Sequence, residues 1–207
     1  MNLLMNCCDG IHPFDRFEVE RLWSPPQLRC LIVGENPGSY DSPYFYERPR
    51  SYENDPVKVR RGLLQNLFKQ KLLPSATLKG FQEAGFLFDH AIRCPLSQKV
   101  IAKERVAAMK YASIRVQNPT HLLTALTQAP IVWVMGHLAS NAVANLTAEF
   151  PKEQRRISSP PFPGEVGPKS RFFVSSYLTR WNEKDWPEIF VAFAQFFFNR
   201  KVVDSLP

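Results

Sequence analysis

Four short runs of β-branched, aromatic and aliphatic residues constrain the fold of this chain more than any other feature. Each run is bounded by turn-forming residues, and the intervals between them span several tens of residues, which suits helical crossovers and not hairpins. The runs are Leu28–Val33, Phe86–Ile92, Ile131–Met135 and Phe172–Tyr177. Strands joined by helical crossovers form a parallel sheet with helices on both faces. We therefore predict an α/β fold with three layers, α/β/α, around a central, mainly parallel four-stranded sheet.

The intervals contain apolar residues at helical spacing. The first interval predicts a helix over Val57–Leu72, with Arg60 and Arg61 largely off its apolar stripe. That stripe consists of Leu63, Leu64, Leu67 and Phe68. Further helices are predicted over Ala76–Ala84, Lys103–Val116, His121–Leu126, Leu138–Leu146 and Asp185–Val202. The last helix carries a stripe that predicts a core-facing side, formed by Trp186, Ile189, Phe190, Phe193 and Phe197.

The length of 207 residues and the hydrophobic share of 44% fit one domain with a substantial core. We expect a single domain over residues 1–207, with residues 1–27 as an N-terminal extension that packs on the core. The apolar runs are shorter than a membrane span needs, and the N-terminus lacks the pattern of a signal peptide. The 4 cysteines are too few for a disulfide framework in a chain of this length. These features predict a soluble, cytoplasmic protein, and we expect a monomer.

The charge balance is basic. Lys and Arg number 26, Asp and Glu number 19, and the formal net charge is +7. This excess suits a polyanionic partner such as nucleic acid, whose phosphates attract Lys and Arg. It suits a basic protein without such a partner equally well. Only the residues of a site can decide between these two interpretations.

Ligands of open parallel sheets bind at the carboxyl ends of the strands, so the loops after the four runs are where a site is expected. The first of these loops reads Gly34-Glu35-Asn36-Pro37-Gly38. Its glycines and proline fix a tight turn and let a ligand approach the backbone closely. The turn makes Glu35 and Asn36 candidates for chemistry at the strand end. Each also has a structural interpretation, because Asn often stabilises a turn through its own backbone and Glu35 can simply face solvent.

The GENPG turn after an apolar strand resembles the first active-site motif of the uracil-DNA glycosylase superfamily. The Asn at its middle position resembles the motif of the mismatch-specific and single-strand-selective branches. The preceding Glu and the chain length look more like those of the iron–sulfur branch. Three later segments resemble further blocks of this superfamily, in the same order. Residues 89–95 are similar to the base-reading segment, residues 131–139 to the third strand and its turn, and residues 176–180 to the second catalytic motif.

The resemblance implies a monofunctional DNA glycosylase of base-excision repair. Such an enzyme hydrolyses the N-glycosidic bond of uracil, or of a related deaminated or mismatched base, after the base flips out of the DNA stack. By resemblance, Asn36 orients the attacking water, and Glu35 is a second candidate for the base. The backbone around Glu35, flanked by Gly34 and Gly38, holds the carbonyl of the departing base. No metal and no organic cofactor are implied.

The resemblance also supplies the walls of the pocket and the DNA contacts. His90 aligns with the Asn that reads the base edge, and one of the aromatic residues Tyr44, Phe45 and Tyr46 provides the stacking face. Ser176 is expected to hold a phosphate. Further DNA contacts are expected from Tyr177, Arg180, Trp181, Arg155 and Arg156.

Each of these residues has a structural alternative. His90 can be a core histidine, and the three aromatic residues can cover the core beneath a long loop. Arg180 can pair with an acidic neighbour, and the basic segment that contains Arg155 and Arg156 can be a solvated loop.

Two features depart from the superfamily. Val174 stands where the second motif has a His, and valine cannot donate a hydrogen bond to the leaving base. Loss of one such donor typically costs on the order of 10²–10³ in rate, unless His90 or His137 substitutes for it. An iron–sulfur cluster is not expected either, because only Cys94 lies at a ligand position and Cys30 fits burial in the first strand better.

Three functions remain open at this stage. The first is the DNA glycosylase. The second is a nucleic-acid-binding protein of the same fold that is catalytically weak or inactive, for which Val174 is the main argument. The third is a hydrolase or binder for free nucleotides or other N-glycosides.

Overall fold

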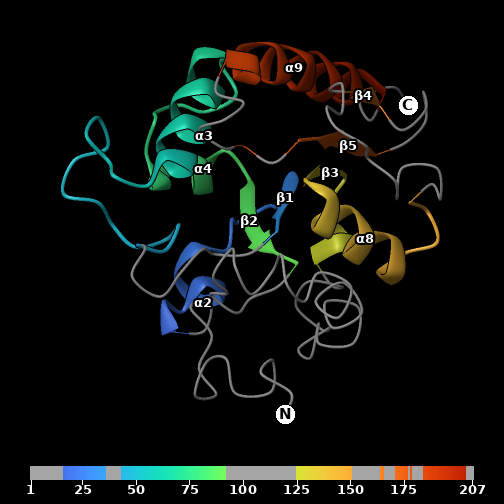
Figure 1. The fold of residues 1–207 in the computed structure, drawn as a ribbon, viewed down its shortest axis with the longest axis horizontal. Helices are drawn as coiled ribbons and strands as arrows, with labels where there is room; N and C mark the ends of the chain where they lie inside the picture. Colours follow the sequence, from blue (N-terminus) through green and yellow to red (C-terminus); the bar gives the residue numbers. More distant parts are fainter. Residues whose placement is uncertain are drawn as a thin grey trace.

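The computed structural model describes residues 16–35, 43–91, 125–150, 164–165, 171–176, 178 and 184–203 (Figure 1). Within them, one sheet has the strand order β2-β1-β3-β5-β4. The strands are β1 (Cys30–Gly34), β2 (Phe86–His90), β3 (Ile131–Met135), β4 (Gly164–Glu165) and β5 (Phe172–Ser175). The four predicted strands are adjacent and parallel, and the short β4 adds an antiparallel edge beside β5. The predicted α/β fold around a mainly parallel sheet is therefore confirmed.

The four parallel strands end at the same edge of the sheet. Gly34, the last residue of β1, lies opposite His90, the last residue of β2. In the next pair, Met135 of β3 lies opposite Ser175 of β5. The turns that follow these strands leave from this edge, which we call the carboxyl edge. It is the edge at which a parallel sheet presents its loops to a ligand.

Helices lie on both sides of the sheet, as crossover connections require (Figure 1). Helices α3, α4 and α9 lie on one side and α8 on the other, while α2 lies beyond the end of β2. The bounds are α2 (Val19–Trp23), α3 (Lys58–Lys69), α4 (Leu78–Glu83), α8 (His137–Leu146) and α9 (Trp186–Val203). The predicted helix over Lys103–Val116 and most of that over His121–Leu126 fall outside the described residues.

An aromatic layer fills the space between the sheet and α9. Trp133 of β3 stacks on Phe193 with ring centroids 4.2 Å apart, and Phe86 of β2 stacks on Phe197 at 5.5 Å. The Trp133 indole N–H donates a hydrogen bond to Ser175 Oγ at 2.8 Å, so this polar group is satisfied within the layer. The predicted apolar stripe of α9 is buried along its whole length, and its large buried apolar area stabilises the fold.

The prediction for α3 is wrong at two positions. Phe68, assigned to the apolar stripe, is 47% exposed, whereas Arg60, assigned to the polar side, is 1% exposed. Arg60 can be buried because its guanidinium pairs with Asp55 and donates to backbone carbonyl groups of the segment that precedes α3. A buried charge is tolerated when it is paired and hydrogen-bonded. The three leucines of the stripe are buried as predicted.

The N-terminal extension contains α2, a helix that the sequence analysis did not predict. Its Val19 and Trp23 side chains are buried in the core cluster, so α2 is attached to the domain through one apolar side. None of the helices in the described part of the chain combines the length and the apolar character needed to cross a bilayer.

Candidate functional site at the carboxyl edge

The ends of β1 and β2 bring the start of the GENPG turn next to His90. Gly34 lies opposite His90, and the Ala91 N–H donates to the Gly34 carbonyl at 2.8 Å, which extends the pairing beyond the strand. The turn then leaves the sheet at Glu35. The described part of the site therefore consists of the strand ends, Glu35 and the aromatic residues 44–46.

The Glu35 side chain lies across the amino end of α8. Its Oε1 atom accepts a hydrogen bond from the Leu138 backbone N–H at 3.2 Å. Gly136, directly before α8, makes room for this carboxylate, because a Cβ added there would lie 2.5 Å from Oε1. A carboxylate is favoured at this position, where unpaired N–H groups and the helix dipole are positive. Glu35 thus joins the turn after β1 to the turn after β3.

The three candidates for a stacking face differ in their contacts. Phe45 lies in the core, where it stacks on Phe88 of β2 with ring centroids 4.4 Å apart. The Tyr46 hydroxyl contacts the backbone of Phe88 on the outer side of β2. Tyr44 adjoins His90, with ring centroids 5.9 Å apart. All three side chains are buried, and Tyr44 is the one that lies at the end of the strand beside the proposed base-reading residue.

The Tyr46 hydroxyl completes the outer edge of β2. It accepts a hydrogen bond from the Phe88 N–H at 2.7 Å and donates one to the Phe88 carbonyl at 3.0 Å. β2 is an edge strand, and buried backbone groups of an edge strand need a partner outside the sheet. Burial raises the pKa of Tyr46 above its usual range, so the hydroxyl stays protonated. Tyr46 is therefore a structural residue.

The Arg60 guanidinium holds the segment 44–47 against α3. Its Nη1 donates to the carbonyl oxygens of Tyr44 at 2.8 Å and Phe45 at 2.9 Å, and also to that of Glu47. Its Nη2 donates to Asp55 Oδ1 at 2.7 Å, and its Nε donates to Oδ2 of the same carboxylate. A buried ion pair thereby fixes the backbone of Tyr44.

Sequence reasoning missed both members of this pair. Asp55 carries a recognisable signal, because an Asp just before a helix often accepts a hydrogen bond from the first helical N–H groups. Its Oδ1 accepts one from the Val57 N–H, at the start of α3, at 2.9 Å. Nothing in the sequence marks Arg60 as buried, because its partners come from a non-helical segment.

The ends of β3 and β5 position the other expected residues. Val174 is 2% exposed and paired with β3, so its side chain belongs to the core. Ser176 follows β5 and is half-buried, and its carbonyl accepts a hydrogen bond from Ser175 Oγ at 3.0 Å. His137 is the first residue of α8, and its Nε2 lies 3.2 Å from Asn141 Nδ2. His137 therefore lies beside the helix end that holds Glu35.

Several residues of the expected site fall outside the described residues, and their roles stay predictions: Asn36, Gly38, Arg155, Arg156, Tyr177, Arg180 and Trp181. Cys94 also falls outside. Cys30 is buried in β1, as predicted, and burial raises the pKa of its thiol. In the part of the chain that the structure describes, no group of three or more His, Cys, Asp or Glu side chains is placed to hold a metal ion.

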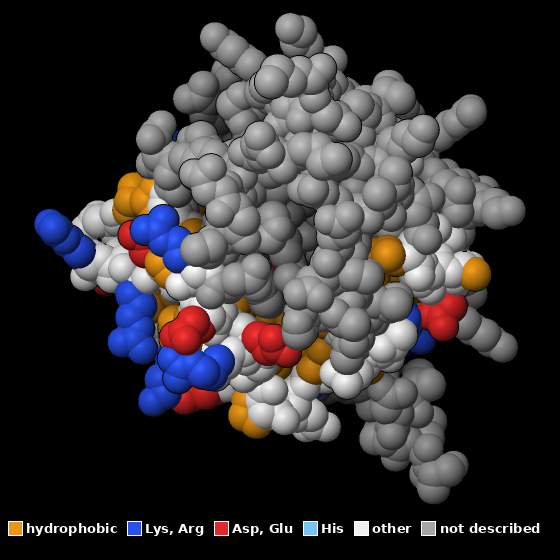
Figure 2. Space-filling model, turned by 90° about the horizontal axis from the view of Figure 1, so that it is seen from below, with side chains coloured by type: hydrophobic (Ala, Val, Ile, Leu, Met, Phe, Trp, Pro, Cys, Tyr) orange, Lys and Arg blue, Asp and Glu red, His pale blue; other side chains and the backbone are white. Residues whose placement is uncertain are grey.

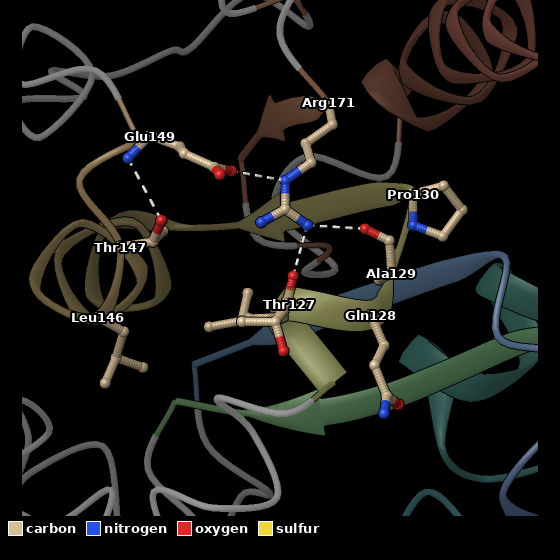
Figure 3. A pocket seen from close by; sticks show the side chains of 9 residues that line it. Thr127, Gln128, Ala129, Pro130, Leu146, Thr147, Glu149 and Arg171 are labelled. Atoms are coloured by element: carbon tan, nitrogen blue, oxygen red, sulfur yellow. Dashed lines mark hydrogen bonds and ion pairs between the residues drawn. The ribbon is translucent and has the colours of Figure 1, made fainter. Parts of the chain in front are cut away.

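A pocket of about 350 Å³ lies at the amino ends of β3 and β5, away from the carboxyl edge (Figure 3). Its most polar wall is Arg171, whose Nε donates to Glu149 at 2.8 Å and whose Nη1 donates to the Ala129 carbonyl at 2.7 Å. The guanidinium is thus engaged by acceptors of the protein itself. None of the expected base-binding residues that the structure describes lines this pocket.

The surface around α2 is basic in part only. Seen from below the view of Figure 1, Lys and Arg side chains gather toward one flank with Asp and Glu side chains among them (Figure 2). Arg48 lies over the Trp23 ring at 5.7 Å, and Arg16 lies over the Phe17 ring at 5.8 Å. In both cases the guanidinium is attracted to the face of the aromatic ring.

No model of a known protein family matches this sequence, and no curated protein matches it. A functional proposal therefore rests on the residues and on their arrangement at the carboxyl edge.

Proposed function

We propose that the protein is a monofunctional DNA glycosylase that hydrolyses the N-glycosidic bond of uracil, or of a related deaminated or mismatched base flipped out of DNA. The convergence of three residues carries the proposal. Gly34 lies opposite His90, and Tyr44 adjoins His90 at 5.9 Å. In the proposed mechanism Gly34 begins the turn that positions the water, His90 reads the base edge and Tyr44 supplies the stacking face. His90 is distant from the other two residues in the sequence, and the same resemblance assigns all three to one site.

The reaction needs a water placed at the sugar C1′ atom, a group that holds the base edge and stabilisation of the leaving base. In the proposed mechanism Asn36 orients the water, and His90 donates to the base edge. Glu35 supports the turn through the hydrogen bond that its Oε1 atom accepts from the Leu138 N–H. Val174 supplies no donor at the end of β5, so we expect a rate lower by on the order of 10²–10³ than with a donor there.

The direct test is base excision from oligonucleotides that contain uracil, hypoxanthine or a G·T mismatch. Abasic products are cleaved with alkali and the fragments are separated. We expect scission on at least one lesion, lost in Asn36→Ala and retained in the control Asn54→Ala, which changes the same residue type at an exposed position not expected in the site. Scission no greater than that of Asn36→Ala on every lesion would contradict the proposal.

The second candidate is a nucleic-acid-binding protein of the same fold without catalytic activity. Val174 favours it, because a valine has no hydrogen-bond donor in its side chain and this one is packed in the core. It predicts DNA binding that weakens steeply with salt, no turnover, and no effect of Asn36→Ala on binding.

For either function we propose a monomer in the cytoplasm that needs no metal and no organic cofactor. Analytical ultracentrifugation tests the oligomeric state.

A further inference from the structure

Phe17 covers one face of the Tyr44 ring. The two rings are stacked, with centroids 5.4 Å apart and planes 20° from parallel. This is the offset arrangement that aromatic rings prefer, and it is also the arrangement that a flat nucleobase adopts on a tyrosine. Tyr44 is only 5% exposed. A base can therefore stack on this face of Tyr44 only after Phe17 has moved.

The backbone beside Phe17 favours such a movement. Glu18, the next residue, has φ +47°, in the left-handed region that residues other than glycine rarely adopt. Its carboxylate pairs with Arg21, but both side chains are more than half exposed, so the pair holds the conformation only weakly. A change at Glu18 into an ordinary region relieves the strain and displaces Phe17. Val19 and Trp23 meanwhile keep α2 on the core.

We propose that Phe17 is a displaceable cover over the base-stacking face of Tyr44. This inference rests on the proposed function, since it assigns a flipped base to that face. Breaking the stack of Phe17 on Tyr44 opposes binding, and a planar heterocycle compensates by stacking on Tyr44 in its place. A sugar or a phosphate alone cannot do so. The cover therefore weakens binding only of ligands that insert a base at Tyr44, and undamaged duplex, in which no base is presented, does not have to displace it.

The test compares Phe17→Ala and Phe17→Leu with the unaltered protein. Leu22→Ala is the matched control, because Leu22 is an exposed apolar residue of the helix α2, which begins two residues after Phe17. The ligand is a labelled duplex that carries 2′-fluoro-2′-deoxyuridine, a uracil nucleotide resistant to hydrolysis, or thymidine at the same position. Fluorescence anisotropy gives the affinity for each duplex. Thermal unfolding of each variant establishes that it is folded.

We expect the preference for the uracil duplex to rise in Phe17→Ala by roughly two- to twelve-fold, which corresponds to the usual strength of an aromatic pair. Phe17→Leu, which fills the space without a ring, should show a smaller rise, and Leu22→Ala should show none. An unchanged preference in both Phe17 variants overturns the inference.

Uracil excision by the same proteins distinguishes a failure of this inference from a failure of the proposed function. If the unaltered protein excises uracil while the Phe17 variants keep its KM and its affinities, the cover is excluded and the glycosylase stands. If neither the unaltered protein nor Phe17→Ala excises a base or distinguishes the two duplexes, the proposed function is excluded, and the inference with it.

Discussion

Arg60 and Asp55 form an ion pair in the core, with side chains that are 1% and 0% exposed. The guanidinium donates to both carboxylate oxygens and to backbone carbonyl groups of Tyr44 and Phe45. The charge is thus compensated, and the backbone that carries Tyr44 is held where its ring adjoins His90. The geometry of the proposed site depends on this pair, although it lies behind the aromatic segment.

Asp55→Ala should destabilise the protein strongly, because it leaves a buried guanidinium without its counter-charge. A loss of about 3–5 kcal/mol in the free energy of unfolding is typical of a broken buried pair. The matched control is Glu83→Ala, which breaks the exposed pair of Lys79 and Glu83 at 3.6 Å and should cost less than about 0.5 kcal/mol. Urea unfolding measures both. Equal losses in the two variants would show that the Arg60 charge is hydrated.

Tyr46→Phe removes the hydroxyl group through which this side chain hydrogen-bonds to the backbone of β2. The Phe88 N–H and carbonyl lose their partner while staying buried, and such a loss costs about 1–3 kcal/mol. Tyr52→Phe is the control, because Tyr52 is half-buried against the same core. Hydrogen exchange should also become faster at the Phe88 amide. Unchanged exchange there would mean that water replaces the hydroxyl without penalty.

Gly136→Ala should destabilise the protein by about 1–3 kcal/mol, because φ is +90° at this position. The new methyl group would also displace the Glu35 carboxylate from the Leu138 N–H. A double-mutant cycle with Glu35→Ala, followed by chemical denaturation, should therefore give a combined loss smaller than the sum of the single losses. Strict additivity would indicate that the two residues do not interact. Glu35→Gln, which keeps an acceptor oxygen and loses only the charge, should cost less stability than Glu35→Ala.

Cys30 should be unreactive in the folded protein. Burial raises the pKa of its thiol, so the folded protein keeps it protonated where the unfolded thiol, with a pKa of about 8.5, ionises. Its contribution to stability is complete below that pH and declines as the pH rises toward the folded pKa. Peptide-resolved labelling with iodoacetamide at pH 8 should modify Cys30 in urea but not in buffer. Equal labelling rates in both conditions would contradict the burial.

The raised pKa of the Cys30 thiol also predicts how the free energy of unfolding depends on pH. The free energy of unfolding should fall above about pH 8.5, and Cys30→Ala should flatten part of that slope. The remaining slope belongs to other groups, among them Tyr46, whose pKa is also raised by burial. Unfolding curves at several alkaline pH values measure the difference between the two proteins.

Apolar patterning by itself determined the four parallel strands and the helices α3, α4, α8 and α9. A run such as Ile131–Met135 is buried at every position, so its sequence is continuously apolar whatever its neighbours are. The stripe of α9 likewise follows from its helical period, because one side of the helix faces the sheet. These are local properties, and one sequence is enough to see them.

Tertiary structure decided which distant residues meet. The strand order β2-β1-β3-β5-β4 places His90 opposite Gly34, and the path of the chain around β2 brings Tyr44 to His90. The burial of Arg60 depended on carbonyl groups from a segment without regular structure. The stack of Phe17 on Tyr44 depended on how the chain just before α2 packs on that segment. Periodicity reports how much of a residue is buried, whereas the identity of its partner depends on how elements pack, and only the folded chain contains that information.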